Sequence, residues 1–92
     1  PPHFTTRPKL NYEVKSGQDL NITCVSAGSP MPSVRWREGV QDLTPYDGAP
    51  IGKNVLRLHN IRQTRNYTCL AASKLGIVET HTLVKVQCKY FA

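Results

Sequence analysis

Three short stretches decide how this chain folds: Asn21-Ile22-Thr23-Cys24, Val34-Arg35-Trp36 and Asn66-Tyr67-Thr68-Cys69. Trp36 follows Cys24 by twelve residues, and Cys69 lies thirty-three residues further on. Tyr67 stands two residues before Cys69. Within the stretches, residues that favour burial alternate with polar ones, which is the period of a β-strand that buries one face. The chain is therefore organised around two cysteines, a tryptophan and a tyrosine on half-buried strands.

These spacings are typical of an all-β fold, the immunoglobulin-like β-sandwich. In that sandwich two cysteines join strands B and F, and a strand-C tryptophan packs on the bridge. A tyrosine two residues before the second cysteine fixes the E–F corner through its hydroxyl. The likeness assigns the disulfide to Cys24 and Cys69 and the two core roles to Trp36 and Tyr67. Cys88 either pairs with a neighbouring segment or is a free thiol.

Period-two alternation along the rest of the chain predicts seven to eight strands. A short connection between strands C and E favours the I-set type of sandwich, with small C′ and D strands between Glu38 and Lys53. By the same phase, Leu70 and Leu83 point outward on strands F and G, where they form an apolar patch or lie under a neighbouring domain. The other strands are expected at residues 1–8 (A), 11–14 (A′), from 20 (B), around 34–36 (C), 55–61 (E), 67–71 (F) and 77–86 (G).

The length of 92 residues indicates one small domain. We expect it to occupy residues 1–87, with residues 88–92 beginning the linker to a further domain. A disulfide persists only in an oxidising compartment, so the chain is expected to be extracellular. No stretch reaches the roughly 18 apolar residues of a membrane span, and no signal peptide opens the chain. Both observations suit a domain taken from a longer receptor or secreted protein.

Several motifs along the chain belong together: Gly28-Ser29-Pro30-Met31-Pro32, Val34-Arg35-Trp36, Asp42-Leu43-Thr44-Pro45, Pro50-Ile51-Gly52-Lys53-Asn54-Val55-Leu56, Arg62-Gln63, Asn66-Tyr67-Thr68-Cys69 and Leu75-Gly76. The part between Asp42 and Leu56 is the most specific, because generic sandwiches do not share it. Together the motifs resemble one family, the LAR-type receptor protein tyrosine phosphatases, and within it the third immunoglobulin domain. Arg65, where a small residue is expected, and Cys88 depart from the family pattern.

The resemblance implies a single-pass receptor at the plasma membrane with immunoglobulin domains, fibronectin type III repeats and cytoplasmic phosphatase domains. Such receptors act in axon guidance and synapse organisation, and their outer domains engage synaptic adhesion proteins and heparan sulfate proteoglycans. The chain is accordingly interpreted as a non-catalytic adhesion and recognition module. Its partners would be the neighbouring domains and such ectodomains, and it would meet the membrane only through the parent receptor.

The sequence holds no constellation that predicts an enzyme. The family's phosphatase chemistry needs a cysteine thiolate with an arginine six residues on. Pro30 and Leu75 stand at that distance from Cys24 and Cys69. Neither a phosphate-binding loop nor a nucleophile elbow is present. We therefore expect no catalytic residue, cofactor or metal, because the three histidines also lack partners at metal-ligand spacing: His3, His59 and His81.

Two glycosylation sequons lie on predicted strands. Asn21 and Asn66 each stand three residues before an inward cysteine, on the outward phase that a glycan needs. Because short sequons also arise by chance, glycan occupancy stays open. Tyr46, in the C′–D stretch, is the one mid-chain aromatic residue expected at the surface and is a candidate partner contact. A tyrosine that packs on its own loop is the competing interpretation.

The net charge of +6 permits attraction to polyanions and defines the alternative function. Arg35, Arg37 and Lys85 are expected to share the outer face of the C–F–G sheet, where they could bind heparan sulfate. A solvated face is the favoured interpretation, because Lys53 and Arg57 lie on the other side and the charge is spread. Nucleic-acid binding is disfavoured, since most aromatic residues have core or loop roles.

Overall fold

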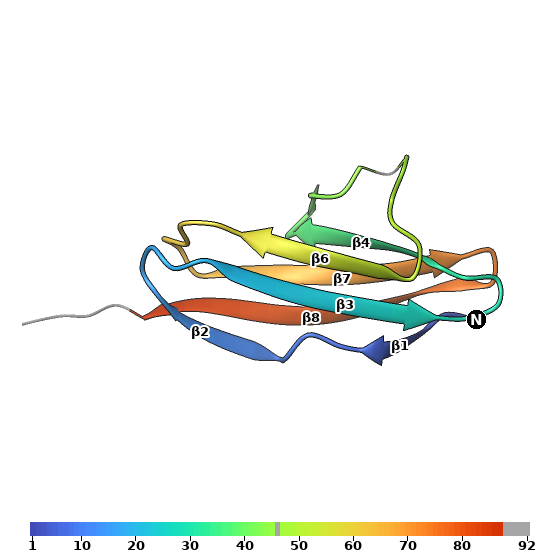
Figure 1. The fold of residues 1–92 in the computed structure, drawn as a ribbon, viewed down its shortest axis with the longest axis horizontal. Helices are drawn as coiled ribbons and strands as arrows, with labels where there is room; N and C mark the ends of the chain where they lie inside the picture. The colour runs from blue at the N-terminus through green and yellow to red at the C-terminus, as the bar shows by residue number, and fades with distance from the viewer. Residues whose placement is uncertain (46, 88–92) are drawn as a thin grey trace, which may run out of the picture.

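The computed structural model describes residues 1–45 and 47–87, which form two packed β-sheets (Figure 1). One sheet has three strands in the order β1-β3-β6, and the other has five in the order β2-β8-β7-β4-β5. The predicted all-β sandwich is confirmed. The strands are β1 His3–Thr6, β2 Asn11–Lys15, β3 Leu20–Ala27, β4 Ser33–Glu38, β5 Gln41–Asp42, β6 Lys53–Leu58, β7 Arg65–Ser73 and β8 Gly76–Gln87.

The first strand is divided between the sheets, as the predicted A and A′ pieces required. β1 pairs antiparallel with β3, whereas β2 pairs parallel with β8. The two ends of the sandwich are well separated in Figure 1. At one end the backbone of Pro1 and Pro2 lies against Gly28, and at the other Lys15 is in register with Gln87. The described chain therefore enters and leaves at opposite ends.

The core is built around the disulfide between Cys24 and Cys69, whose Cα atoms are 6.7 Å apart. Trp36 is in register with Cys69 on the neighbouring strand and is fully buried. Ile22 and Val34 complete the centre of a cluster drawn from both sheets. Most side chains on the outward phase of the strands are exposed or half-buried, as the alternation in the sequence predicts.

Tyr67 keeps part of its predicted role. Its ring is 5% exposed and belongs to the core cluster. Among residues 1–45 and 47–87 no hydrogen bond from its hydroxyl is found, so the expected hydroxyl anchor of the E–F corner is not seen. The corner is instead joined by backbone bonds, in which Gly17 donates to Ile61 and Ile61 donates to Gln18.

The predicted strand D was wrong. Of the described residues between Asp42 and Lys53, only Ile51 makes a bridge, and it does so with Ser33 of β4 in the opposite sheet. Pro50 cannot donate to a ladder, and Gly52 turns the chain with a φ of +82°. The segment therefore crosses from one sheet to the other without pairing with β6.

The predicted patch of Leu70 and Leu83 was also wrong. Leu70 is opposite Glu79 and Leu83 is opposite Asn66, four positions apart along β8. Leu70 is only 3% exposed, and Arg35 of β4 is its register partner on the other side. A long arginine stem can cover an apolar neighbour while its charged end stays in water.

Candidate functional site

The described residues hold no group of three or more histidine, cysteine or acidic residues that could bind a metal. His59 Nδ1 lies 3.5 Å from a carboxylate oxygen of Asp19, and His81 Nδ1 lies 2.8 Å from the Thr68 hydroxyl. In the same residues no helix has the length and apolarity to cross a membrane. A groove lies between β6 and the segments at residues 43–45 and 48–50, and it is the candidate site described below.

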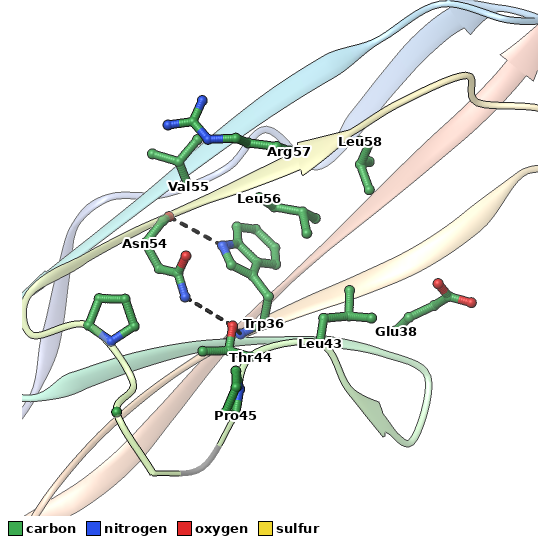
Figure 2. A pocket seen from close by; sticks show the side chains of 12 residues that line it. Trp36, Glu38, Leu43, Thr44, Pro45, Asn54, Val55, Leu56, Arg57 and Leu58 are labelled. Carbon is green, nitrogen blue, oxygen red and sulfur yellow. Dashed lines mark hydrogen bonds between the residues drawn. The ribbon is translucent and has the colours of Figure 1, made fainter.

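One wall of this groove is the edge of β4, which the following segment caps with hydrogen bonds (Figure 2). The Val34 amide donates to the Pro50 carbonyl at 2.8 Å. The Trp36 amide donates to the Thr44 hydroxyl at 3.2 Å, and the Trp36 carbonyl accepts from Leu43 at 2.8 Å. β5 pairs with β4 only at Arg37 and Glu38, and along the rest of this edge a crossing loop and one hydroxyl take the place of a strand.

Asn54, an inward-facing residue of β6, completes the cap. Its side-chain amide donates to the Val34 carbonyl and to the Thr44 hydroxyl, each at 3.0 Å. Its main-chain carbonyl accepts from the indole nitrogen of Trp36 at 3.2 Å, and Figure 2 shows Asn54 bonded to both the indole and Thr44. The central tryptophan is therefore oriented by hydrogen bonds as well as by packing.

The other wall of the groove is the edge of β6. The Ser26 amide donates to the Gly52 carbonyl at 2.8 Å, and the β3–β6 register continues this alignment through Ile22 and Leu56. Because bonded and non-bonded pairs alternate in an antiparallel ladder, Val55 and Arg57 turn their backbone groups away from β3. Within residues 1–45 and 47–87 those groups have no other hydrogen-bond partner, so this edge is open.

The groove between the two walls has a volume of about 580 Å³. Apolar side chains dominate its lining, with the polar pair Thr44 and Asn54 at its base (Figure 2). Its one acidic side chain, Glu38, forms an ion pair with Arg65. The apolar lining residues include Trp36, Leu43, Pro45, Pro50, Leu56 and Leu58.

The predicted basic residues lie on one face but do not form one cluster. Arg37 Nε is 3.0 Å and Arg35 Nη1 is 3.8 Å from the same carboxylate oxygen of Asp42. Arg37 lies in the same row across the strands as His81 of β8. Lys85 is four positions further along β8, in register with Glu13 at the far edge of the sheet. The structure therefore brings the two arginines together with an acid and leaves the lysine apart.

Arg65, the departure from the family pattern, has a structural role at the E–F end. It pairs with Glu38 of β4 and also donates to the Gln63 side chain. Both charges act on Tyr67 nearby. Burial raises the pKa of Tyr67, the carboxylate of Glu38 raises it further, and Arg65 opposes the shift.

Both predicted sequon asparagines are exposed. Asn21 lies on the outer face of the three-stranded sheet, opposite Arg57. Asn66 lies on the outer face of the five-stranded sheet, opposite Leu83. Glycans at the two positions would therefore stand on the outer faces of different sheets. Tyr46 and Cys88, the candidate contact and the unassigned cysteine, lie outside the described residues.

Sequence reasoning missed the residues that make the groove, above all Thr44 and Asn54. A signal for Asn54 was present, because the phase of Leu56 and Leu58 puts it on the inward face of its strand. A polar residue at an inward position needs hydrogen-bond partners, which marks it as part of a network. No pattern within the sequence signals Thr44 or the open edge, since both depend on how the crossing segment packs.

Comparison with known proteins places the chain in context. The model of the immunoglobulin domain family matches residues 1–73. The chain is 51% identical over 87 residues to tyrosine-protein phosphatase Lar of Drosophila melanogaster, covering 95% of the chain and 4% of that protein. It is 45% identical over 86 residues to receptor-type tyrosine-protein phosphatase S of Gallus gallus, covering 94% of the chain and 6% of that protein.

Solved structures agree with the fold. The N-terminal Ig1-2 module of the Drosophila receptor phosphatase DLAR superposes with a TM-score of 0.80 and 24% identity, over 95% of this chain and 49% of that one. A chain of the complex between titin M10 and an obscurin-like 1 immunoglobulin domain gives a TM-score of 0.79 at 28% identity, over 95% and 94% of the two chains.

Proposed function

The chain belongs to the immunoglobulin domain family, and on that premise we propose that it is an extracellular adhesion and recognition module of a LAR-type receptor tyrosine phosphatase. The identity of 44–51% to receptor phosphatases over nearly the whole chain is the observation that carries the proposal. It also confirms the family resemblance seen in the sequence. Because the chain spans 4–6% of these relatives, the activity and partners of a whole receptor remain part of the proposal.

The domain itself is non-catalytic, because the immunoglobulin fold to which it belongs is not a catalytic one. We propose that it acts as the third immunoglobulin domain of its receptor, in series with further immunoglobulin and fibronectin type III domains. The separation of the two ends of the described chain suits a link in such a series (Figure 1). Roles in axon guidance and synapse organisation follow from the resemblance alone. Residues 88–92 would lead to the next domain.

The experiment measures binding of the secreted, glycosylated domain to a panel of synaptic adhesion ectodomains, at low and at physiological salt. Salt-tolerant, saturable binding to one ectodomain is expected of a recognition module. If no ectodomain binds the isolated domain or a multidomain ectodomain that contains it, the recognition role is wrong. If only the multidomain protein binds, and removal of this domain does not weaken it, the domain is a spacer.

Binding to heparan sulfate is the second candidate, supported by the net charge of +6. The geometry weakens it, because Arg35 and Arg37 share Asp42 and Lys85 lies apart. The same experiment includes immobilised heparin. A polyanion site should lose affinity steeply with salt and again when both arginines are replaced by alanine. Salt-insensitive or absent heparin binding removes this candidate.

We further propose that Asn21 and Asn66 carry N-linked glycans. Both are exposed on strands and stand in complete sequons. Intact mass of the secreted domain should fall in two steps as Asn21→Gln and Asn66→Gln are introduced and combined. An unchanged mass in either single variant shows that the replaced site is not used. Two occupied sites would confine partner contact to loops, edges and ends.

A further inference from the structure

We propose that the open edge of β6 is a docking site for an extended peptide segment of a partner, which adds an antiparallel strand there. Acidic residues of that segment would face Lys53 and Arg57, with apolar residues between them entering the groove. The inference rests on the proposed recognition role and adds the location of the contact and the chemistry of the partner.

The backbone of β6 provides the first argument. The odd-numbered residues of β6 present their amides and carbonyls to the groove side, whereas those of Leu56 face Ile22 of β3. An unpaired strand edge is a template for another strand, and peptides bind proteins in this way through main-chain hydrogen bonds. Six residues, Lys53–Leu58, make β6 the longest edge strand, since β1, β2 and β5 have four, five and two.

The side chains around this edge give the pattern that an added strand must carry. Alternate residues of a strand point to opposite faces. A peptide residue opposite Val55, and those two positions away from it, would lie on the outer face beside Lys53 and Arg57, which are exposed. The peptide residues between them would enter the groove, about 580 Å³ in volume, over Leu43. A five-residue core therefore suits both faces when its ends are acidic, its second and fourth residues are apolar, and its central residue is of any type.

The charges on this edge select the occupant. Lys53 and Arg57 are both cationic and flank Val55 at two residues on either side. In an antiparallel pair of two β6 edges centred on Val55, each Lys53 would face Arg57 of the second copy, and like charges directly opposite destabilise a sheet. Glu38 within the groove is already paired with Arg65. The edge therefore opposes a second copy of this chain and favours an acidic partner strand.

The test uses the 92-residue domain and a fluorescent synthetic peptide with the core Glu-Ile-Thr-Val-Glu between Gly-Ser flanks. Saturable binding is expected by fluorescence anisotropy. Methylation of the threonine backbone nitrogen, which would face Val55, should weaken binding at least about tenfold because it removes a main-chain hydrogen bond. The matched control carries the same methyl group on the neighbouring isoleucine nitrogen, which faces away, and should bind nearly as well.

A charge swap tests the partner chemistry. The domain variant Lys53→Glu with Arg57→Glu should bind the acidic peptide about tenfold more weakly, since two attractive cross-strand pairs become repulsive. A peptide with lysine in place of both glutamates should bind this variant better than it binds the natural domain. Near-ultraviolet circular dichroism of Trp36 checks that the variant folds, and Lys53→Gln with Arg57→Gln serves if it does not.

Three peptide-binding results would overturn the proposal. They are the absence of saturable binding at millimolar peptide, equal binding of the two methylated peptides, and an acidic peptide that binds the charge-swapped domain unchanged. Self-association of the domain that Lys53→Glu strengthens, because the new glutamate would face Arg57 of the second copy, would name a second copy as the occupant instead and would overturn it too. None of these results bears on the receptor role, which the ectodomain panel tests separately.

Discussion

The edges of β4 and β6 face each other across one groove, but their backbone groups differ in hydrogen bonding. The edge of β4 is hydrogen-bonded through Thr44, Asn54 and the carbonyl of Pro50. The edge of β6 lacks such partners among the described residues. Both result from one event, the crossing of the segment before β6 from one sheet to the other. The crossing covers one edge with a loop and leaves the other without the strand that would have paired with it.

The difference shows that the backbone of a strand can be hydrogen-bonded without a further strand being added to the sheet. Side chains at two positions, Thr44 and Asn54, satisfy the backbone of β4 as a strand would, but they present no new edge. β4 is thereby closed to further pairing, whereas β6 stays available and is protected against its own copy by charge. The following predictions test the cap first and the open edge afterwards.

Removing Asn54 should have the largest effect on stability. Asn54→Ala removes the side-chain amide that donates to the Val34 carbonyl and to the Thr44 hydroxyl, and we expect the free energy of unfolding to fall by about 2–3 kcal/mol. The main-chain carbonyl that accepts from the Trp36 indole is kept in this variant. Chemical denaturation monitored by tryptophan fluorescence measures it. The matched control is Asn11→Ala, an exposed asparagine, which should change stability by less than about 0.5 kcal/mol. Equal effects would mean that the cap contributes nothing.

Removing the hydroxyl of Thr44 should have the next largest effect. Thr44→Val keeps the shape of the side chain but leaves two donors, the Trp36 amide and the Asn54 side chain, without an acceptor. We expect a loss of about 1–2 kcal/mol. Thr44→Ser retains the hydroxyl and should stay close to the natural domain. A valine variant as stable as the serine variant would show that the hydroxyl is not needed.

Hydrogen exchange compares the two edges directly without altering stability. The Trp36 amide, which is bonded to Thr44, should exchange at least about a hundredfold more slowly than the Val55 and Arg57 amides, after correction for intrinsic rates. Leu56, whose amide faces β3, is the internal control and should be protected. Slow exchange at Val55 and Arg57 in the free domain would contradict an open edge.

The smallest effect is expected from acid, at the point where β6 ends. The Asn60 amide donates to Asp19 at 2.8 Å, and this bond lowers the pKa of Asp19, with a further lowering by His59. A lowered carboxyl pKa stabilises the fold above the ordinary value, and this contribution is lost as the pH falls through about 4 and below. The melting temperature of the natural domain should therefore fall more steeply with decreasing pH below about pH 4 than the melting temperature of Asp19→Asn. Parallel declines would exclude this carboxylate as a source of acid sensitivity.

Much of the fold was predictable because its signals are local. The inward phase of Ile22, Cys24, Trp36 and Val84 follows from period-two alternation, and all four are buried. The disulfide followed from the likeness of the cysteine spacing to an immunoglobulin sandwich. The strand D error arose because proline and glycine positions mark turns but do not say which sheet the chain joins next.

The candidate site was far less predictable. Arg35, Arg37 and Lys85 share a face by phase, as expected, but the sequence does not show that Asp42 lies between the two arginines. Leu70 is outward by phase and still buried, and its register neighbour Arg35 has a stem long enough to cover it. Which side chains are neighbours across strands depends on the register between two segments, and the sequence of one segment alone does not determine that register.

By itself the sequence determined most of the strands and of the faces they bury, the family, and the cysteines that join the sheets. Each of these depends on residues close in the chain or on spacings that the family shares. Only the tertiary structure decided which edge is capped and which is open, and that Lys53 and Arg57 flank a groove lined by Trp36. The physical reason is that a strand has an open edge only when no other segment pairs with it, and this depends on the path of the rest of the chain.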